Sequence, residues 1–88
     1  PKPAAAGPAK KLSYKKKYAL ETLPGEMDEL HGKIAALEAR MADPAFYTRD
    51  PQGFSRVAAE LDALREKLSA LEEEWLELEM LREEIEGA

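Results

Sequence analysis

The sequence has no cysteine and only one histidine, His31, among its 88 residues. Without cysteine there is no disulfide framework and no thiolate metal site, which fits a reducing compartment. No apolar run approaches the roughly 18 residues that cross a bilayer, so no membrane partner is predicted. The Gly-x-x-x-x-Gly-Lys-[Ser/Thr] phosphate-binding motif is also missing. We therefore expect no cofactor, no metal and no catalytic activity in this chain, and we predict that His31, which follows the apolar Leu30, is a surface residue.

Proline and glycine are absent from residues 54–86. Apolar side chains recur in this stretch at alternating intervals of three and four residues: Phe54, Val57, Leu61, Leu64, Leu68, Leu71, Trp75 and Leu78. This spacing is the heptad seam of a coiled coil. A helix from about residue 51 to residue 86 would be roughly 50 Å long. Because so long a rod cannot bury its seam on itself, the sequence predicts a partner helix.

The same chain supplies that partner upstream. A second seam with the same alternation consists of Leu20, Leu23, Met27, Leu30, Ile34, Leu37 and Met41. A short break at about residues 43–53, with Asp43-Pro44 ending one helix and Asp50-Pro51 starting the next, folds the two seams back on each other. The predicted fold is all-α, an antiparallel two-helix coiled-coil hairpin. Pairing the seams outward from the turn puts Met41 near Phe54 and Val57, Ile34 near Leu61, Met27 near Leu68, and Leu20 near Trp75.

Composition and length predict a single small domain preceded by a linker. Residues 1–11 form a disordered basic linker rich in proline and alanine, and residues 12–88 form the hairpin domain. Pro24 predicts a break after a short N-terminal helical segment capped by Ser13. That segment is expected to dock on the long second helix, with Tyr14 and Tyr18 near Trp75 and Leu78.

Charge is distributed unevenly along the chain. Residues 1–20 hold six lysines and no acid, whereas residues 72–86 hold eight glutamates and one arginine. Lysines with tyrosines between them can contact phosphates while a ring stacks on a base. The candidate nucleic-acid site is therefore Lys10, Lys11, Lys15, Lys16, Lys17, Tyr14 and Tyr18. Neutralisation of the acidic helix end by these lysines is an equally weighted alternative.

The turn between the helices holds a second group of candidate residues. Possible contacts at this tip are Arg40, Arg49, Arg56, Phe46 and Tyr47. The favoured interpretation of Phe46 and Tyr47 is that they fold back and close the open end of the seam. The alternative is that they form an aromatic contact surface at the tip of the hairpin.

Four short pieces together form a recognisable signature: residues 11–17 (KLSYKKK), 20–24 (LETLP), 41–47 (MADPAFY) and 74–79 (EWLELE). Their order and spacing resemble the C-terminal domain of Uup-type ABC-F ATPases. The resemblance implies a cytoplasmic parent protein with two ATP-binding cassettes, where ATP and Mg²⁺ would bind, and no membrane domain. It also implies a DNA-binding coiled coil that favours branched DNA, in a family that acts on ribosomes or nucleic acid.

Three functional hypotheses follow. The first is an accessory domain that binds nucleic acid, either DNA, including branched DNA, or ribosomal RNA. The second is a protein-interaction or spacer arm that contacts the ribosome or the parent ATPase cassettes in cis. The third is a self-associating coiled coil, although the isolated hairpin is expected to be a monomer.

Overall fold

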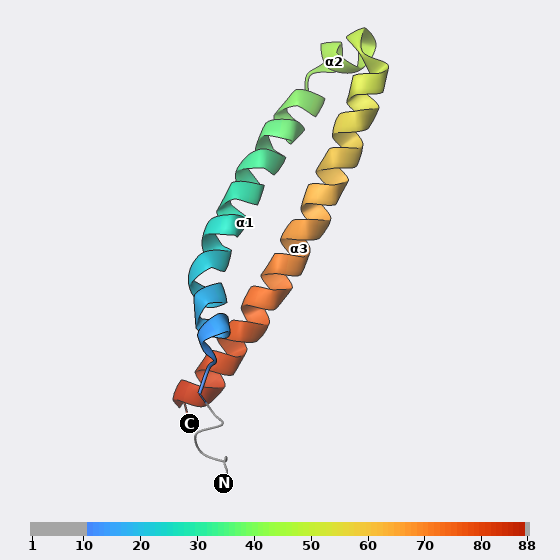
Figure 1. Ribbon diagram of the computed structural model, residues 1–88. Coiled ribbons are helices and arrows are strands. Elements are labelled where there is room, and N and C mark those ends of the chain that lie inside the picture. The colour runs from blue at the N-terminus through green and yellow to red at the C-terminus, as the bar shows by residue number, and fades with distance from the viewer. Residues whose placement is uncertain (1–10, 88) are drawn as a thin grey trace.

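A computed structural model describes residues 11–87 and shows three helices: α1 (Tyr14–Met41), α2 (Pro44–Arg49) and α3 (Pro51–Gly87). α1 and α3 run antiparallel side by side, and the short α2 joins them at one end (Figure 1). The molecule is a rod with principal extents of 67 × 19 × 16 Å. Between residues 11 and 87 there is no strand. The predicted all-α hairpin is confirmed.

The seam between α1 and α3 is the hydrophobic core. Its buried members are Leu30, Ile34, Leu61 and Leu68, and partly buried side chains pack around them: Met27, Leu37, Met41, Leu64 and Leu71. All nine belong to the two heptad seams seen in the sequence. Burial of apolar surface at about 25 cal/mol per Å² stabilises the pairing. No polar or charged residue is buried in the described part of the chain, so the helix pair is held mainly by this stripe.

The pairing register differs from the predicted one by a heptad. The Arg65 guanidinium lies 2.6 Å from the Glu38 carboxylate, and His31 lies 3.9 Å from Glu72. Trp75 consequently borders the same groove as Met27, the residue expected beside Leu68. The predicted register is therefore wrong by one heptad for every pair: Met41 with Phe54, Ile34 with Leu61, Met27 with Leu68, and Leu20 with Trp75. Ile34 and Leu61 still belong to the same buried cluster.

The shift has its cause in α2, a helix that the sequence did not lead us to expect. Phe46 of α2 is buried, and its ring lies 5.7 Å from the ring of Phe54 in the first turn of α3. α2 therefore packs on the start of α3, where the sequence predicts that Met41 packs. As a result, α1 pairs with α3 from one heptad further along.

The caps around α2 explain why the chain turns here. Asp43 accepts a hydrogen bond from the amide of Ala45 at 3.0 Å, and Asp50 accepts one from the amide of Gly53 at 3.0 Å. Each carboxylate thus satisfies an amide at the start of a helix that opens with proline. A Cβ at Gly53 would meet the Asp50 carboxylate, so a larger residue would displace this capping side chain. Asp50-Pro51 starts the long helix as predicted, whereas Asp43-Pro44 opens α2.

At the other end of the rod, the predicted break at Pro24 is absent. α1 continues through Pro24, and the hydroxyl of Ser13 caps its start by accepting a hydrogen bond from the Lys16 amide at 3.2 Å. Proline lacks the amide that would bond the Leu20 carbonyl. Burial of the neighbouring Leu23, which is 4% exposed, offsets that loss.

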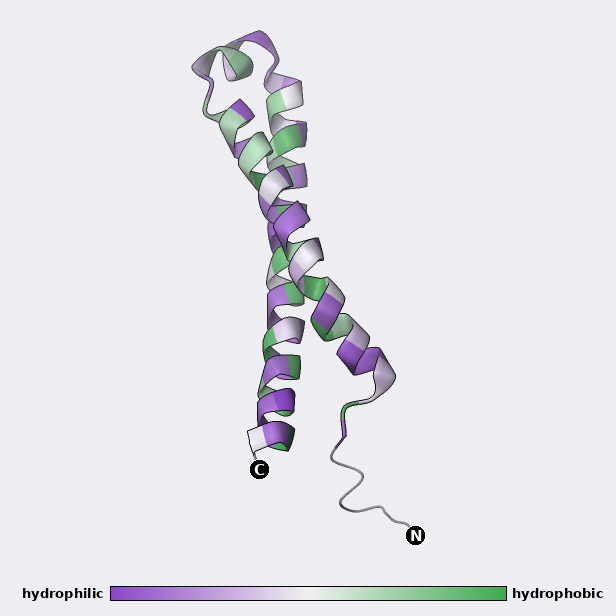
Figure 2. Ribbon diagram, turned by 90° about the vertical axis from the view of Figure 1, so that its left-hand side faces the viewer, coloured by the Kyte–Doolittle hydropathy of each residue, from purple (hydrophilic) through white to green (hydrophobic). Residues whose placement is uncertain are grey.

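The first turns of α1 are not docked along the face of α3. α1 diverges from α3 towards its N-terminal end (Figure 2). Tyr14 and Tyr18 are 81% and 57% exposed, so their predicted packing near Trp75 and Leu78 is wrong. The segment before α1 and the end of α3 still approach each other at a groove bordered by Leu12 and Ile85. The N-terminal segment is therefore an exposed extension of α1 and not a separate docked helix.

Candidate nucleic-acid interface

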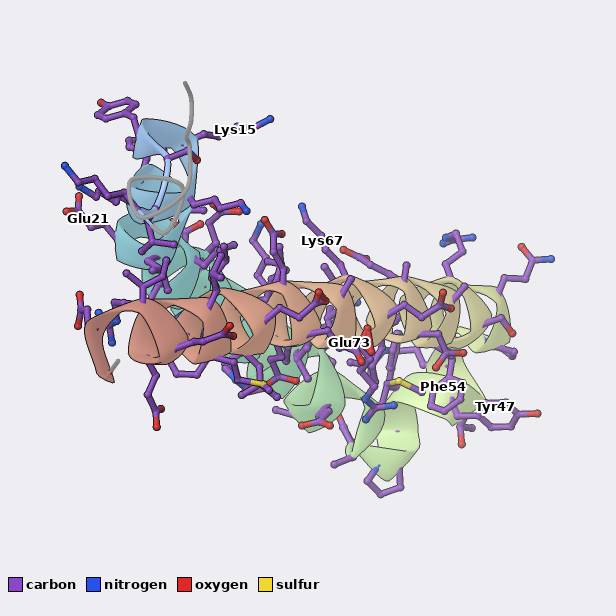
Figure 3. The ribbon with its side chains drawn as sticks, turned by 90° about the horizontal axis from the view of Figure 1, so that it is seen from below. Lys15, Glu21, Tyr47, Phe54, Lys67 and Glu73 are labelled. Atoms are coloured by element: carbon purple, nitrogen blue, oxygen red, sulfur yellow. The ribbon has the colours of Figure 1, made fainter. Side chains whose placement is uncertain are left out.

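The lysines of the candidate site lie at the exposed start of α1. Lys11 precedes the helix, Lys15, Lys16 and Lys17 lie in its first turns, and all four are exposed. Figure 3 shows Lys15 projecting from α1 away from α3. The predicted contact Lys10 lies outside the described residues. We call Lys11, Lys15, Lys16 and Lys17, with Tyr14 and Tyr18, the basic end.

Two tyrosines complete the basic end. The rings of Tyr14 and Tyr18 are stacked, with centroids 6.4 Å apart and an angle of 25° between their planes. They lie one helical turn apart, the spacing that places side chains on the same face. Because they are largely exposed, their outer faces are available to a planar ligand. A nucleobase is such a ligand.

The electrostatics of this end favour an anion. The unpaired amides at a helix N-terminus carry a partial positive charge, and the lysines add to it. Among residues 11–87, no carboxylate lies within 4.0 Å of a lysine of the basic end. Direct ion pairing of these lysines with Glu72–Glu84, the alternative considered from the sequence, is therefore not observed.

The acidic residues gather on the C-terminal third of α3. Glu72, Glu73, Glu74 and Glu77 are exposed, and Arg82 pairs with Glu79 of the same helix. Lys17 and Glu86 border a common groove where the two helix ends approach. A phosphate backbone would be repelled by this face of α3. Lys15 and Lys16 of the basic end do not border the groove that Lys17 shares with Glu86.

At the tip of the hairpin, Phe46 is buried and Tyr47 is exposed, so each of the two interpretations holds for one of these residues. Phe46 is 5% exposed and lies beneath the Arg40 guanidinium at 4.9 Å, so it closes the seam as favoured from the sequence. Tyr47 is 58% exposed, and its ring meets the edge of Phe54 at 5.1 Å. Figure 3 shows Tyr47 and Phe54 together at the end of the rod opposite Lys15. Tyr47 thus remains available for contact.

Arginines surround this tip. Arg40 and Arg49 border a small groove with Asp43 and Asp50, and Arg56 is exposed on α3. Both aspartates accept hydrogen bonds from backbone amides, and neither lies within 4.0 Å of an arginine side-chain nitrogen. The structure therefore brings the predicted tip residues together, but far from the basic end, on a rod 67 Å long.

Residues 11–87 hold no cluster of three or more histidine or acidic side chains able to bind a metal. His31 is 60% exposed, as predicted for a surface residue. Among the described residues, no helix combines the length and apolar character needed to cross a membrane.

One surface was missed by sequence reasoning. On one flank of the seam, α1 and α3 border a groove through Pro24, Met27, Asp28, His31, Glu72, Trp75 and Leu76. The signal was Leu76, an apolar residue that follows Trp75 but belongs to no seam position. Heptad spacing alone does not reveal it, because Leu76 lies outside that spacing.

The fold defines the class of the protein: an all-α coiled-coil hairpin domain. Residues 11–80 match the family model of the ABC transporter C-terminal domain, so the chain belongs to that family. The predicted Uup-type C-terminal domain is confirmed by this match and by the relatives of the chain. No solved structure shows a significant match.

The relatives are ATP-binding proteins several times longer. The chain is 41% identical over 80 residues to ATP-binding protein Uup of Haemophilus influenzae, covering 88% of this chain and 12% of that protein. It is 34% identical over 72 residues to Uup of Escherichia coli, covering 82% and 11%. It is 43% identical over 91 residues to Uup of Caulobacter vibrioides, covering 98% and 15%. The chain thus spans less than a sixth of the length of these relatives.

Proposed function

We propose that this domain is a nucleic-acid-binding accessory domain of a Uup-type ATPase, with the basic end of α1 as its contact surface. The observation that carries the proposal is the exposure of four lysines and a stacked tyrosine pair on a helix end that diverges from the acidic α3. The lysines contact phosphates, and Tyr14 or Tyr18 stacks on a base. DNA, including branched DNA, and ribosomal RNA are the candidate ligands.

The proposal extends to the longer protein. ATP and Mg²⁺ bind in cassettes outside this domain, hydrolysis takes place there, and the whole protein works in the cytoplasm. Its relatives carry the name ATP-binding protein, which supports this assignment. The hairpin supplies a rigid rod and the contact with nucleic acid.

Binding across a salt series tests the proposal. Single-stranded, duplex and branched DNA and a structured RNA are labelled and titrated with the domain at several salt concentrations. Affinity that falls steeply with salt indicates phosphate contacts. The replacement of Lys15, Lys16 and Lys17 by alanine should weaken binding at least tenfold and flatten the salt dependence. Equal affinity of this variant and the parent chain would refute the assignment of the basic end.

A matched variant separates the two ends of the rod. Replacement of Arg40, Arg49 and Arg56 by alanine removes the same charge from the tip. Retained binding in this variant assigns the contact to the basic end, whereas equal losses in both variants would show a response to net charge alone.

The second candidate function is a protein-interaction arm that uses the tip. The exposed ring of Tyr47, which rests on Phe54, favours it. The ribosome and the parent ATPase cassettes are the candidate partners. Capture of the ATPase core by the domain, lost with Tyr47→Ala and kept with the triple lysine variant, would favour this function. A concentration-dependent mass in sedimentation would instead favour the self-associating coiled coil.

A further inference from the structure

We propose that the groove between α1 and α3 at Trp75 is a docking site for a basic amphipathic helix of a partner protein. The groove has a volume of about 380 Å³ and is bordered by Pro24, Met27, Trp75 and Leu76 among others. Its occupant would lie beside the two helices and form a local three-helix bundle. The site is separate from the basic end and does not depend on nucleic-acid binding.

The apolar stripe is wider here than a two-helix coiled coil requires. Met27 and Trp75 occupy seam positions, where apolar side chains are expected. Pro24 and Leu76 flank the seam, in positions that usually carry polar or charged residues when only two helices pair. Leu76 is 54% exposed, although it borders the groove. A third helix would cover it.

The opposite flank of the same stretch shows the ordinary arrangement. It is bordered by Glu26, Lys33 and Lys67 beside Leu30 and Leu71, and encloses only about 70 Å³. Long charged side chains of both signs border the seam there. The two flanks therefore differ in both volume and chemistry, and only the Trp75 flank offers an apolar surface to a partner.

Pro24 explains why the groove opens at this level. Its missing amide leaves the Leu20 carbonyl without a helical donor, and proline favours a bend in a helix. Pro24 lies inside the N-terminal half of α1, the half that diverges from α3 (Figure 2). Trp75 is consequently only partly buried.

Charge decides which partner fits. Asp28 and Glu72 stand on the rim of the groove, His31 lies 3.9 Å from Glu72, and no lysine or arginine borders it. Met80, one turn beyond Leu76, is 61% exposed and shares a groove with Glu83 and Glu84. An apolar strip lined by carboxylates complements a helix with one apolar face and lysine or arginine beside it. Nucleic acid, an anion, does not fit this surface.

The test uses the single tryptophan of the chain as its reporter. The probe is an 18-residue helical peptide with leucine on one face and lysine on the others, and the same peptide with glutamate in place of lysine is the charge control. The lysine peptide is expected to bind and to shift the emission of Trp75 to shorter wavelength. An unchanged Trp75 emission at saturating lysine peptide, or equal binding of the glutamate peptide, would overturn the proposal.

Two matched variants separate docking from general attraction. Leu76→Glu places a charge in the groove, whereas Ser69→Glu places the same charge one heptad earlier on the same exposed side of α3. Leu76→Glu should weaken peptide binding at least tenfold, and Ser69→Glu should leave it unchanged or slightly stronger. If both variants bind the peptide at least as tightly as the parent chain, the attraction is purely electrostatic and the proposal is wrong.

A second copy of the chain is the competing occupant. Sedimentation without peptide, at several protein concentrations, distinguishes it. A monomer that binds the lysine peptide supports the proposal. A dimer that Leu76→Glu dissociates would show that the groove serves self-association, which overturns the assignment to a partner protein. Helical content from circular dichroism confirms that each variant is folded.

Discussion

Arg65 of α3 and Glu38 of α1 lie 27 residues apart in sequence, yet their side chains meet at 2.6 Å across the seam. Both side chains are about half exposed, so the pair contributes on the order of 0.5 kcal/mol to stability. The pair is informative about the register, because it identifies which turns of the two helices face each other. Together with His31 and Glu72, it defines the register of the hairpin.

The register can be tested by cross-linking, since the chain contains no cysteine. Glu38→Cys combined with Arg65→Cys should form an intramolecular disulfide rapidly under mild oxidation, because these positions face each other. Glu38→Cys with Ala58→Cys tests the register predicted from the sequence and should react slowly. Mobility on a denaturing gel measures both. Faster closure of the second pair would contradict the observed register.

Gly53→Ala should destabilise the hairpin by about 1 kcal/mol, the usual value of a lost helix cap. The new Cβ would meet the Asp50 carboxylate and displace it from the Gly53 amide. Gly32→Ala is the control, because its Cβ meets nothing within 4 Å and alanine favours the helix by about 1 kcal/mol. Urea denaturation followed by circular dichroism measures both. If both substitutions changed the free energy of unfolding in the same direction, the role of Gly53 would be contradicted.

Pro24→Ala should stabilise α1 by about 1 to 3 kcal/mol, because alanine restores the amide that bonds the Leu20 carbonyl. The helix is then expected to follow α3 more closely and to shield Trp75. Thermal unfolding measures the stability, and acrylamide quenching measures the exposure of Trp75. Unchanged quenching would show that Pro24 does not cause the divergence. Gly25→Ala, at a site with open space around it, controls for helix propensity alone.

Phe46→Ala and Tyr47→Ala should differ in their cost to stability. Phe46 is 5% exposed, and its truncation removes packing against Phe54 and Arg40, at a cost of about 3 kcal/mol. Tyr47 is 58% exposed and loses mainly one edge contact with Phe54, worth about 1 kcal/mol. Chemical denaturation of the two variants provides the comparison. A larger loss for Tyr47→Ala would contradict the arrangement of the tip.

The three lysines at the start of α1 should determine the salt dependence of nucleic-acid binding. Each phosphate contact contributes a slope of about 0.9 to the logarithmic dependence of duplex affinity on salt. Replacement of Lys15, Lys16 and Lys17 should therefore reduce that slope by up to about 3. Fluorescence anisotropy with labelled duplex at several salt concentrations measures the slope. Replacement of Lys33 and Lys67, which border the seam, should leave it nearly unchanged.

Much of the fold was determined by residues that are close in sequence. The two alternating seams predicted both long helices, and the capping roles of Ser13 and Asp50 were correctly anticipated. Helix periodicity and caps depend on hydrogen bonds and contacts within about one turn, so the local sequence specifies them. The exposed lysines of the candidate site follow from the same local pattern.

Tertiary structure alone decided the register, the path of α1 and the groove at Trp75. A shift of one heptad still brings apolar residues together at every level, so the two seams do not distinguish Leu68 from Trp75 as the neighbour of Met27. The choice depends on Phe46 packing against Phe54, a contact that exists only once α2 has formed. In the same way, α1 continues through Pro24 because burial of Leu23 offsets the lost hydrogen bond, and burial is a property of the assembled hairpin.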